Sequence, residues 1–256
     1  FPKHAEALHE TCDISDFIWS YGYMLMATGD VKWADKMESA VYNAALGAIN
    51  KDFKALQYFS SPNQLLATEK SSMAPYGEEG LSRQAYRPGF DVECCSGNVH
   101  RMFPNYISRM WMNGDEHEIV AALYGPSEYR TEINGTKVCI TEDTSYPFSG
   151  KITFRFALDG APVRIPFTMR IPSWVENAKL TVNAEQPKEY HAGGFSTIER
   201  RFKDGDVVEL DIDMKPRAEK RTDAGINVYM GPLLYSVDID ENVEIIKDQF
   251  KTPVAF

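Results

Sequence analysis

Apolar residues in the first fifty positions recur at the spacing of amphipathic helices. Ile14, Ile18 and Leu25 share one helical face, and the Thr-Gly-Asp stretch after them predicts the end of that helix. A second run with the same spacing covers residues 31–50. Because only a short connection separates the two runs, the sequence predicts an antiparallel pair of helices.

The helical pattern breaks over residues 51–93 and then resumes. This stretch contains several prolines and glycines, which predict a long irregular segment of the kind that often carries function. A third apolar stripe runs from Val99 to Trp111 and predicts another helix. Pro104 lies within it, so we expect either a kink or a new start at that position.

After residue 114 the apolar positions alternate instead. Residues 151–158, 163–171 and 207–214 each place apolar side chains on one face and mostly polar side chains on the other. Such runs predict half-buried strands. Pro166 further predicts that the second of them lies at the edge of a sheet, because proline cannot donate a ladder hydrogen bond.

Together the two patterns predict an α + β protein with two parts. Residues 1–114 are expected to be helical, and residues 115–256 are expected to form an antiparallel, jelly-roll-like β-sandwich. A chain of 256 residues with 43% hydrophobic and 25% charged residues has the composition of a globular protein, so extensive disorder is not expected.

The chain carries a net negative charge. Lysine and arginine total 27 against 37 aspartates and glutamates, a formal charge of −10. This charge repels phosphate backbones and anionic lipid surfaces, so nucleic acid is not an expected partner. No apolar run approaches the roughly 18 residues that span a bilayer, so we expect no membrane span.

The N-terminal stretch FPKHAEALHE has neither an initiator methionine nor the apolar core of a signal peptide. We therefore expect the chain to begin inside a longer protein. The compartment stays open between cytoplasm and periplasm, and a homodimer is among the assemblies that the sequence allows.

Two adjacent cysteines, Cys94 and Cys95, are the first candidates for chemistry. Their Cα atoms lie about 3.8 Å apart across a trans peptide, below the roughly 4.4–6.8 Å of a relaxed disulfide. Glu10 and Cys12 form a second pair of donors where the first helix begins. Three thiolates and one carboxylate match the number and softness of ligands at a tetrahedral zinc ion. The alternative is that the cysteines are buried and inert.

Six segments of the chain, taken in order, carry a family resemblance. They are HETCD, GDVKWADKMESAVYNAAL, ECCSGNVHRM, FTMRIPSWVENAKLTVNAE, GGFSTIERRFKDGDVVELDIDM and GPLLYSVD, and they extend from about residue 8 to about residue 240. Together they resemble glycoside hydrolase family 127, the β-L-arabinofuranosidase-like family. The resemblance implies an N-terminal (α/α)6 barrel that holds the active site, followed by β-sandwich domains. Residues 1–114 would then be the C-terminal part of that catalytic barrel.

The resemblance also implies a role for each candidate residue. The family's Glu-Thr-Cys segment matches Glu10 and Cys12, its paired cysteines match Cys94 and Cys95, and all four would bind Zn2+. Cys94 would also be the nucleophile that attacks the anomeric carbon, and Glu38 would contact the sugar. The general acid/base would lie upstream of residue 1, so this chain alone is expected to be inactive.

The expected chemistry also has a physical rationale. A retaining glycosidase needs a nucleophile on one face of the anomeric carbon and an acid on the other. Cysteine is ordinarily too protonated for this task, but a zinc ion and the N-terminus of the following helix would hold it as the thiolate.

Two departures from the family pattern border the expected sugar site. Ser96, Gly97 and Asn98 stand where the family most often has two prolines and an asparagine. Phe59 stands where the family has a tyrosine, and Tyr58 lies one residue away. The substrate can therefore differ from an arabinofuranoside.

These observations predict a fragment of a retaining glycoside hydrolase that acts on β-L-arabinofuranosides or related plant-polysaccharide sugars. One alternative is a non-catalytic carbohydrate-binding protein with a structural zinc site, which exposed aromatic residues on the sandwich such as Trp174 would favour. Another is a sugar isomerase or epimerase on the same helical barrel.

Overall fold

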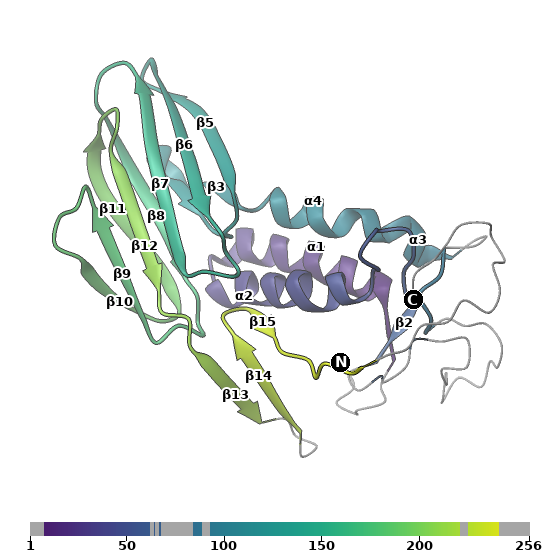
Figure 1. Cartoon of the computed structure of the whole chain (residues 1–256). Helices are drawn as coiled ribbons and strands as arrows, with labels where there is room; N and C mark the ends of the chain where they lie inside the picture. Colours follow the sequence, from purple (N-terminus) through teal and green to yellow (C-terminus); the bar gives the residue numbers. More distant parts are fainter. Residues whose placement is uncertain are drawn as a thin grey trace.

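The computed structural model describes residues 8–61, 64, 67, 84–88, 93–220 and 225–240. In these parts of the chain, a small group of helices extends from one side of a two-sheet β-sandwich (Figure 1). The helical segments are α1 (Thr11–Thr28), α2 (Val31–Ser39), a π-helical turn (Ala40–Ala45), α3 (Cys94–Asn98), a 3-10 turn (Val99–Arg101), α4 (Met102–Ile107) and a second 3-10 turn (Asp115–His117).

The first two helices form the predicted antiparallel pair. Gly29 ends α1 in the left-handed conformation (φ 62°), and its backbone N–H donates to the Leu25 carbonyl at 2.9 Å. Asp30 then caps α2, because its carboxylate accepts a hydrogen bond from the Lys32 N–H at 3.0 Å. The stop and start that the Thr-Gly-Asp stretch predicts are therefore confirmed, and α2 returns alongside α1 (Figure 1).

The third predicted helix, Val99 to Trp111, is shorter and interrupted. It consists of the 3-10 turn Val99–Arg101 and α4, which begins at Met102 and ends at Ile107, and Trp111 instead begins strand β3. Pro104 lies in the first turn of α4, where its missing N–H costs no helical hydrogen bond. Of the two expectations for Pro104, the new start is confirmed.

The strands form one long sheet, one shorter sheet and two small ones. They are β1 (His9–Glu10), β2 (Phe59–Ser60), β3 (Trp111–Asn113), β4 (Ile119–Ala121), β5 (Ser127–Ile133), β6 (Thr136–Thr144), β7 (Lys151–Asp159), β8 (Val163–Ile171), β9 (Asn177–Val182), β10 (Lys188–His191), β11 (Gly194–Phe202), β12 (Val207–Ile212), β13 (Pro216–Lys220), β14 (Ile226–Met230) and β15 (Leu233–Leu234). The sandwich stacks the sheet β10-β9-β12-β7-β6-β5 on the sheet β11-β8-β4-β3. All pairs within them are antiparallel except β4 with β8.

The prediction that Pro166 marks an edge strand is wrong. Its strand, β8, lies inside the shorter sheet, between β11 and β4. The proline is tolerated there because β4 is short. Its first residue, Ile119, pairs with Phe167, so Pro166 lies just outside the stretch that β4 covers.

The inner faces of the two sheets form the larger hydrophobic core. Phe156 of β7 stacks on Phe202 of β11 with ring centroids 4.1 Å apart, and Phe154 of β7 meets Phe167 of β8 edge to face at 5.0 Å. All four rings are almost completely buried. The alternating pattern of the predicted strands therefore does place their apolar side chains between the sheets.

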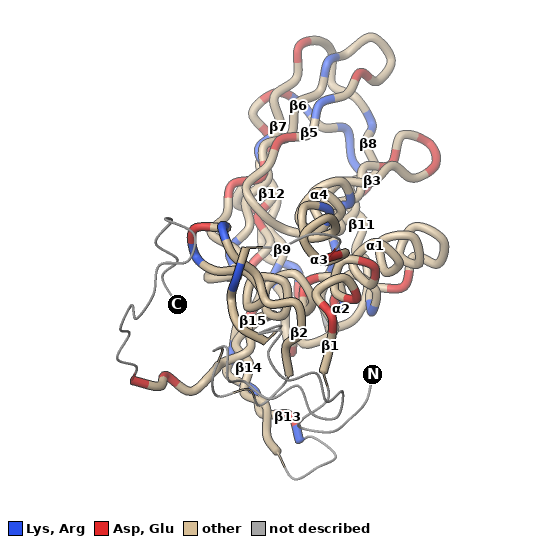
Figure 2. Tube along the Cα trace, turned by 90° about the vertical axis from the view of Figure 1, so that its right-hand side faces the viewer, with Lys and Arg blue, Asp and Glu red and all other residues tan. Residues whose placement is uncertain are grey.

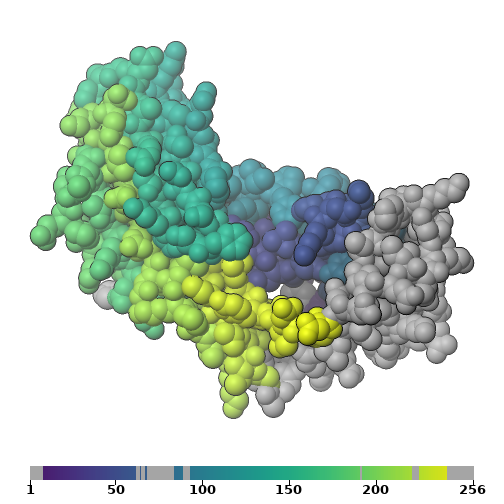
Figure 3. Space-filling model, viewed as in Figure 1, coloured from purple at the N-terminus to yellow at the C-terminus, as the bar shows by residue number. Residues whose placement is uncertain are grey.

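A second core lies among the helices and continues to the sandwich. Ile18 and Leu25 of α1, Met37 of α2 and Met102 of α4 are buried in it, together with Leu123, which follows β4. The small sheet β13–β15 packs at the same junction, where Figure 3 shows it in yellow-green and yellow below the sandwich and the helices. The helices and the sandwich are thus packed against each other.

The described residues form a mixed α and β structure with few helices and many strands. A complete (α/α)6 barrel is not present within the described part of the chain, and the division into two domains at residue 114 stays a prediction. Among the described helices, none has the length and apolar character needed to span a membrane.

Candidate metal centre

The four predicted metal ligands lie together. One ligand atom from each of Glu10, Cys12, Cys94 and Cys95 falls within 4.8 Å of all the others. Glu10 ends β1 and precedes α1, Cys12 lies in the first turn of α1, and the two cysteines begin α3. The starts of α1 and α3 therefore bring together residues that are more than eighty positions apart in the sequence.

Short pairings hold these helix starts in place. Strand β1 pairs with β2, with Glu10 opposite Phe59, and the Thr11 N–H donates to the Tyr58 carbonyl at 3.0 Å. The Thr11 hydroxyl donates to the Gln57 carbonyl. The segment before β2 thus lies beside the start of α1.

The spacing of the donor atoms suits one tetrahedral ion. The sulfurs of Cys12 and Cys95 are 3.2 Å apart, and the Cys94 sulfur is 3.9 Å from a carboxylate oxygen of Glu10. Donors bound at about 2.0–2.3 Å to a tetrahedral ion lie roughly 3.3–3.8 Å from one another. Small movements of the side chains would therefore place all four donors around a single centre.

Burial affects the thiols of this cluster. Cys12 and Cys95 are buried, whereas Cys94 is exposed. Burial raises the pKa of Cys12 and of Cys95, because a thiolate loses its hydration there. A bound cation would reverse this preference, since metal coordination deprotonates thiols. The chemistry of the donor set therefore fits a metal ion.

Two polar side chains that were not among the predicted site residues contact the cluster. The Tyr58 hydroxyl lies 3.1 Å from the Cys94 sulfur and 3.4 Å from a Glu10 oxygen, and its contact with Cys94 raises the pKa of Tyr58. The Asn98 side-chain amide donates to the Cys12 sulfur at 3.3 Å. The family has a tyrosine at the position of Phe59. In this chain the hydroxyl beside the cluster comes from the neighbouring residue, Tyr58.

Asn98 is itself held by surrounding residues. Arg101 donates to the Asn98 side-chain oxygen and to Asp16 of α1, both at 2.8 Å. The Ser15 hydroxyl donates to the Asn98 carbonyl at 3.1 Å. Helix α3 has only five residues, so its dipole contributes little, and these hydrogen bonds do more to fix the cluster.

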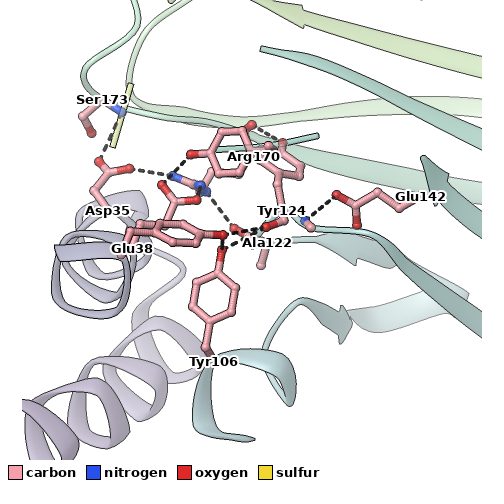
Figure 4. Close-up of polar contacts among 11 residues, drawn as sticks. Asp35, Glu38, Tyr106, Ala122, Tyr124, Glu142, Arg170 and Ser173 are labelled. Atoms are coloured by element: carbon pink, nitrogen blue, oxygen red, sulfur yellow. Dashed lines mark hydrogen bonds and ion pairs between the residues drawn. The ribbon is translucent and has the colours of Figure 1, made fainter. Parts of the chain in front are cut away.

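Glu38 lies in a different place from the four ligands. Its side chain is completely buried at the junction of α2 and β8, where it forms an ion pair with Arg170 and accepts a hydrogen bond from the Tyr146 hydroxyl at 2.8 Å (Figure 4). Burial raises the pKa of Glu38 to about 7. Its predicted contact with the sugar stays a prediction.

Arg170 is the centre of this junction cluster. It is completely buried, and it donates to Asp35 at 2.6 Å and to the Ala122 carbonyl at 2.7 Å in addition to Glu38. Its guanidinium lies 5.3 Å from the ring centroid of Tyr124. The cluster thus joins α2 to β8 and to the segment after β4, as Figure 4 shows.

Hydroxyl groups extend the cluster toward α4. The hydroxyl oxygens of Tyr42 and Tyr106 are 2.9 Å apart, and each hydroxyl lies within hydrogen-bonding distance of the Tyr124 carbonyl, at 3.1 and 3.0 Å. Glu142 is buried nearby and accepts hydrogen bonds from Gly125 and from a serine, yet burial still raises the pKa of Glu142 to about 8.

Fold and site together define the class of protein. The protein has a helical layer packed on a β-sandwich, and one carboxylate and three cysteines lie together where α1 and α3 begin. Two family models cover most of the chain: the GH127 β-L-arabinofuranosidase catalytic domain matches residues 1–108, and the GH127 middle domain matches residues 118–214. The chain therefore belongs to glycoside hydrolase family 127.

Solved structures agree in fold. A protein described as a glycoside hydrolase is 27% identical with a TM-score of 0.74, and the match covers 89% of this chain and 37% of that one. A GH127 β-L-arabinofuranosidase from Geobacillus stearothermophilus T6 is 23% identical with a TM-score of 0.74, covering 91% and 37%. A further GH127 β-arabinofuranosidase is 23% identical with a TM-score of 0.71, covering 89% and 37%.

The chain thus spans little more than a third of the length of these proteins. Among curated protein sequences, none matches it.

Proposed function

We propose that this chain is part of a retaining glycoside hydrolase that uses Cys94 as its nucleophile and acts on β-L-arabinofuranosides or related plant-polysaccharide sugars. The observation that carries the proposal is the convergence of Glu10, Cys12, Cys94 and Cys95 within 4.8 Å. Membership of family 127 supports the same reaction class.

Zinc is the proposed metal. Three sulfurs and one carboxylate oxygen form a donor set of the softness and number that zinc prefers in tetrahedral sites. When bound, zinc would supply the positive charge that keeps its sulfur ligands deprotonated at neutral pH. Asn98 and Arg101 would hold the ligands in place from outside, since outer hydrogen bonds orient metal ligands.

The reaction would proceed in two displacements at the anomeric carbon. In the first, the Cys94 sulfur attacks this carbon, the bond to the glycosidic oxygen breaks, and the leaving oxygen takes a proton from a general acid. The family resemblance places that acid outside residues 1–256. In the second, water attacks the same carbon and gives its proton to the conjugate base of that acid, while the carbon–sulfur bond breaks and its electron pair returns to the Cys94 sulfur.

Two features of this chain suit Cys94 for the attack. It is the exposed member of the three clustered cysteines, so a substrate can reach its sulfur. The Tyr58 hydroxyl, 3.1 Å away, would fix the direction in which the sulfur points.

We also propose that the helices belong to an (α/α)6 barrel that further sequence completes in the whole protein. Helix α1 supports this, because it carries only two charged residues, Asp13 and Asp16, and exposes several large apolar side chains. Figure 2 accordingly draws most of α1 in tan. The most exposed of these side chains are Tyr23 at 51% and Met26 at 61%. Exposed apolar faces of this kind mark surfaces that other segments cover.

Contact between Glu38 and the sugar stays a proposal for the whole protein. In this chain its carboxylate has no exposed surface and is bound to Arg170 and Tyr146. Direct contact would require the junction cluster to open.

The test is the turnover of an aryl β-L-arabinofuranoside by the whole protein and its serine variants. Cys94→Ser should lower kcat by at least about 10³-fold, because the attacking atom is lost. Cys95→Ser should mainly lose bound metal. Cys139→Ser is the matched control, since Cys139 lies on β6, away from the cluster. Equal activity in all three variants would refute the assignment of Cys94 as the nucleophile. A product that keeps its glycosidic bond would indicate an isomerase or epimerase.

A further inference from the structure

A hollow of about 320 Å³ lies where α2, the sandwich and the β13–β14 hairpin meet. We call it the junction pocket, and the residues that matter to its chemistry are Asp35, Ser173, Trp174, Arg217, Glu219 and Tyr229. We propose that the junction pocket binds a neutral saccharide ring, at a site separate from the metal centre.

One wall of the junction pocket is a fixed aromatic and cationic group. The Arg217 guanidinium lies 4.7 Å from the ring centroid of Tyr229 and 5.4 Å from that of Trp174. It also donates to Glu219 at 3.2 Å and to the Gly231 carbonyl at 2.5 Å. Four contacts therefore hold the side chain, so little conformational entropy would be lost when a ligand binds to it.

Another part of the lining is a fixed carboxylate. One oxygen of Asp35 accepts from Arg170 at 2.6 Å and the other accepts from the Ser173 backbone N–H at 3.1 Å, as Figure 4 shows. The Asp35 side chain is still 17% exposed. A carboxylate offers about four acceptor positions, so this group can accept further hydrogen bonds from ligand hydroxyls.

The charges around the pocket favour a neutral ligand. Asp35 and Glu219 are balanced by Arg217 and Lys36. An anion would meet two carboxylates and a cation would meet two basic groups, whereas a polyhydroxylated ring can both donate to the acids and accept from the bases. The Tyr229 and Trp174 side chains add apolar surface to the lining.

Size and construction fit the same ligand. Small-molecule pockets occupy about 300–1,000 Å³, so this one suits a single sugar ring. Asn43, in the π-helical turn that follows α2, donates to the Pro232 carbonyl at 3.0 Å and accepts from the Leu234 N–H at 2.8 Å. The turn between β14 and β15 is thus attached to the helical segment that continues from α2, the helix that carries Asp35.

The hairpin strands β13 and β14, which carry Arg217 and Tyr229, lie on the sandwich side of the helices, whereas α3, which carries two of the metal ligands, lies at the far end of the helical layer (Figure 1). The two sites share no residue. Saccharide binding here therefore does not depend on the proposed thiolate chemistry.

The proposal is tested by isothermal titration of this chain with L-arabinose, D-galactose and D-glucose. At least one sugar should bind, and both Tyr229→Ala and Glu219→Gln should raise its Kd at least about fivefold. Tyr235→Ala is the matched control, because Tyr235 is 56% exposed and lies outside the pocket. It should bind as the unmodified chain does, and so should Cys94→Ser.

Three results would overturn the proposal. One is the absence of binding by all three sugars up to about 50 mM. Another is an unchanged Kd in both pocket variants. The third is a loss of binding in Cys94→Ser alone, which would place the sugar at the metal centre. Because Glu219 is 53% exposed, Glu219→Gln leaves the fold intact and keeps the test decisive if Tyr229→Ala unfolds.

Discussion

Replacing Arg170 by methionine removes the cation at the centre of the junction cluster. Arg170 has no exposed surface, and its contacts reach Glu38, Asp35, the Ala122 carbonyl and the ring of Tyr124. Methionine fills much of the same space but leaves the Glu38 carboxylate buried without its cation. Asp35 is less affected, since it is 17% exposed and keeps the Ser173 N–H.

The expected cost follows from this geometry. Breaking a buried ion pair by removing one partner destabilises a protein by about 3–5 kcal/mol, because the remaining charge is uncompensated. Replacing both partners costs much less. We therefore expect Arg170→Met to lower the free energy of unfolding by about 3–5 kcal/mol, and the double variant Arg170→Met with Glu38→Gln to recover at least half of that loss.

Urea unfolding of this chain measures both quantities. The titrations are best run at about pH 8, above the pKa of about 7 that burial gives Glu38, so that the carboxyl is ionised in the unmodified protein. The free energies of unfolding come from linear extrapolation. A loss below about 1 kcal/mol in Arg170→Met, or a double variant less stable than the single one, would refute the reasoning.

Two further predictions concern the same fold. Because burial raises the pKa of Glu38 from 4.5 to about 7, the native state keeps this proton to higher pH than the unfolded chain does, so the group's contribution to stability falls as pH rises through that window. Urea titrations across it should show the unmodified chain losing up to roughly 3 kcal/mol relative to Glu38→Gln, and parallel curves would contradict the assignment. Gly150→Ala should destabilise the sandwich by more than about 2 kcal/mol in the same assay, because the new Cβ would lie 1.9 Å from the Ile212 carbonyl oxygen. Gly194→Ala has open space at its Cβ and should be nearly neutral, so equal losses in the two variants would be inconsistent with this packing.

Local patterns account for the parts of the fold that the sequence predicts. The end of α1 depends on Gly29 and the start of α2 on Asp30, and both act within a few residues. The alternating runs form strands, as predicted. Side chains on one face of a strand recur at every second residue, so their burial is visible in the local sequence. The prediction of an edge strand from Pro166 was wrong. A proline is tolerated at this position because of where β4 ends, and β4 is distant in the sequence.

The candidate site was predicted by donor chemistry and family resemblance, and its surroundings were not. Residue type, the pairing of these residues in the sequence and the family resemblance made the three clustered cysteines and Glu10 candidates. The contact of Tyr58 with Cys94 spans 36 positions and depends on the pairing of β1 with β2. The partner of Glu38 lies 132 positions away on β8, so the local sequence could not identify Arg170 as the cation that pairs with this carboxylate.

The measurement that tests the central claim most directly is the metal content of the purified chain, kept fully reduced and analysed by mass spectrometry. If Glu10, Cys12, Cys94 and Cys95 share a single ion, the unmodified chain and Cys139→Ser should each hold close to one zinc per chain, and Cys12→Ser should lose it. A metal-free reduced chain, or a Cys12→Ser variant that holds as much zinc as the unmodified chain, would contradict the account.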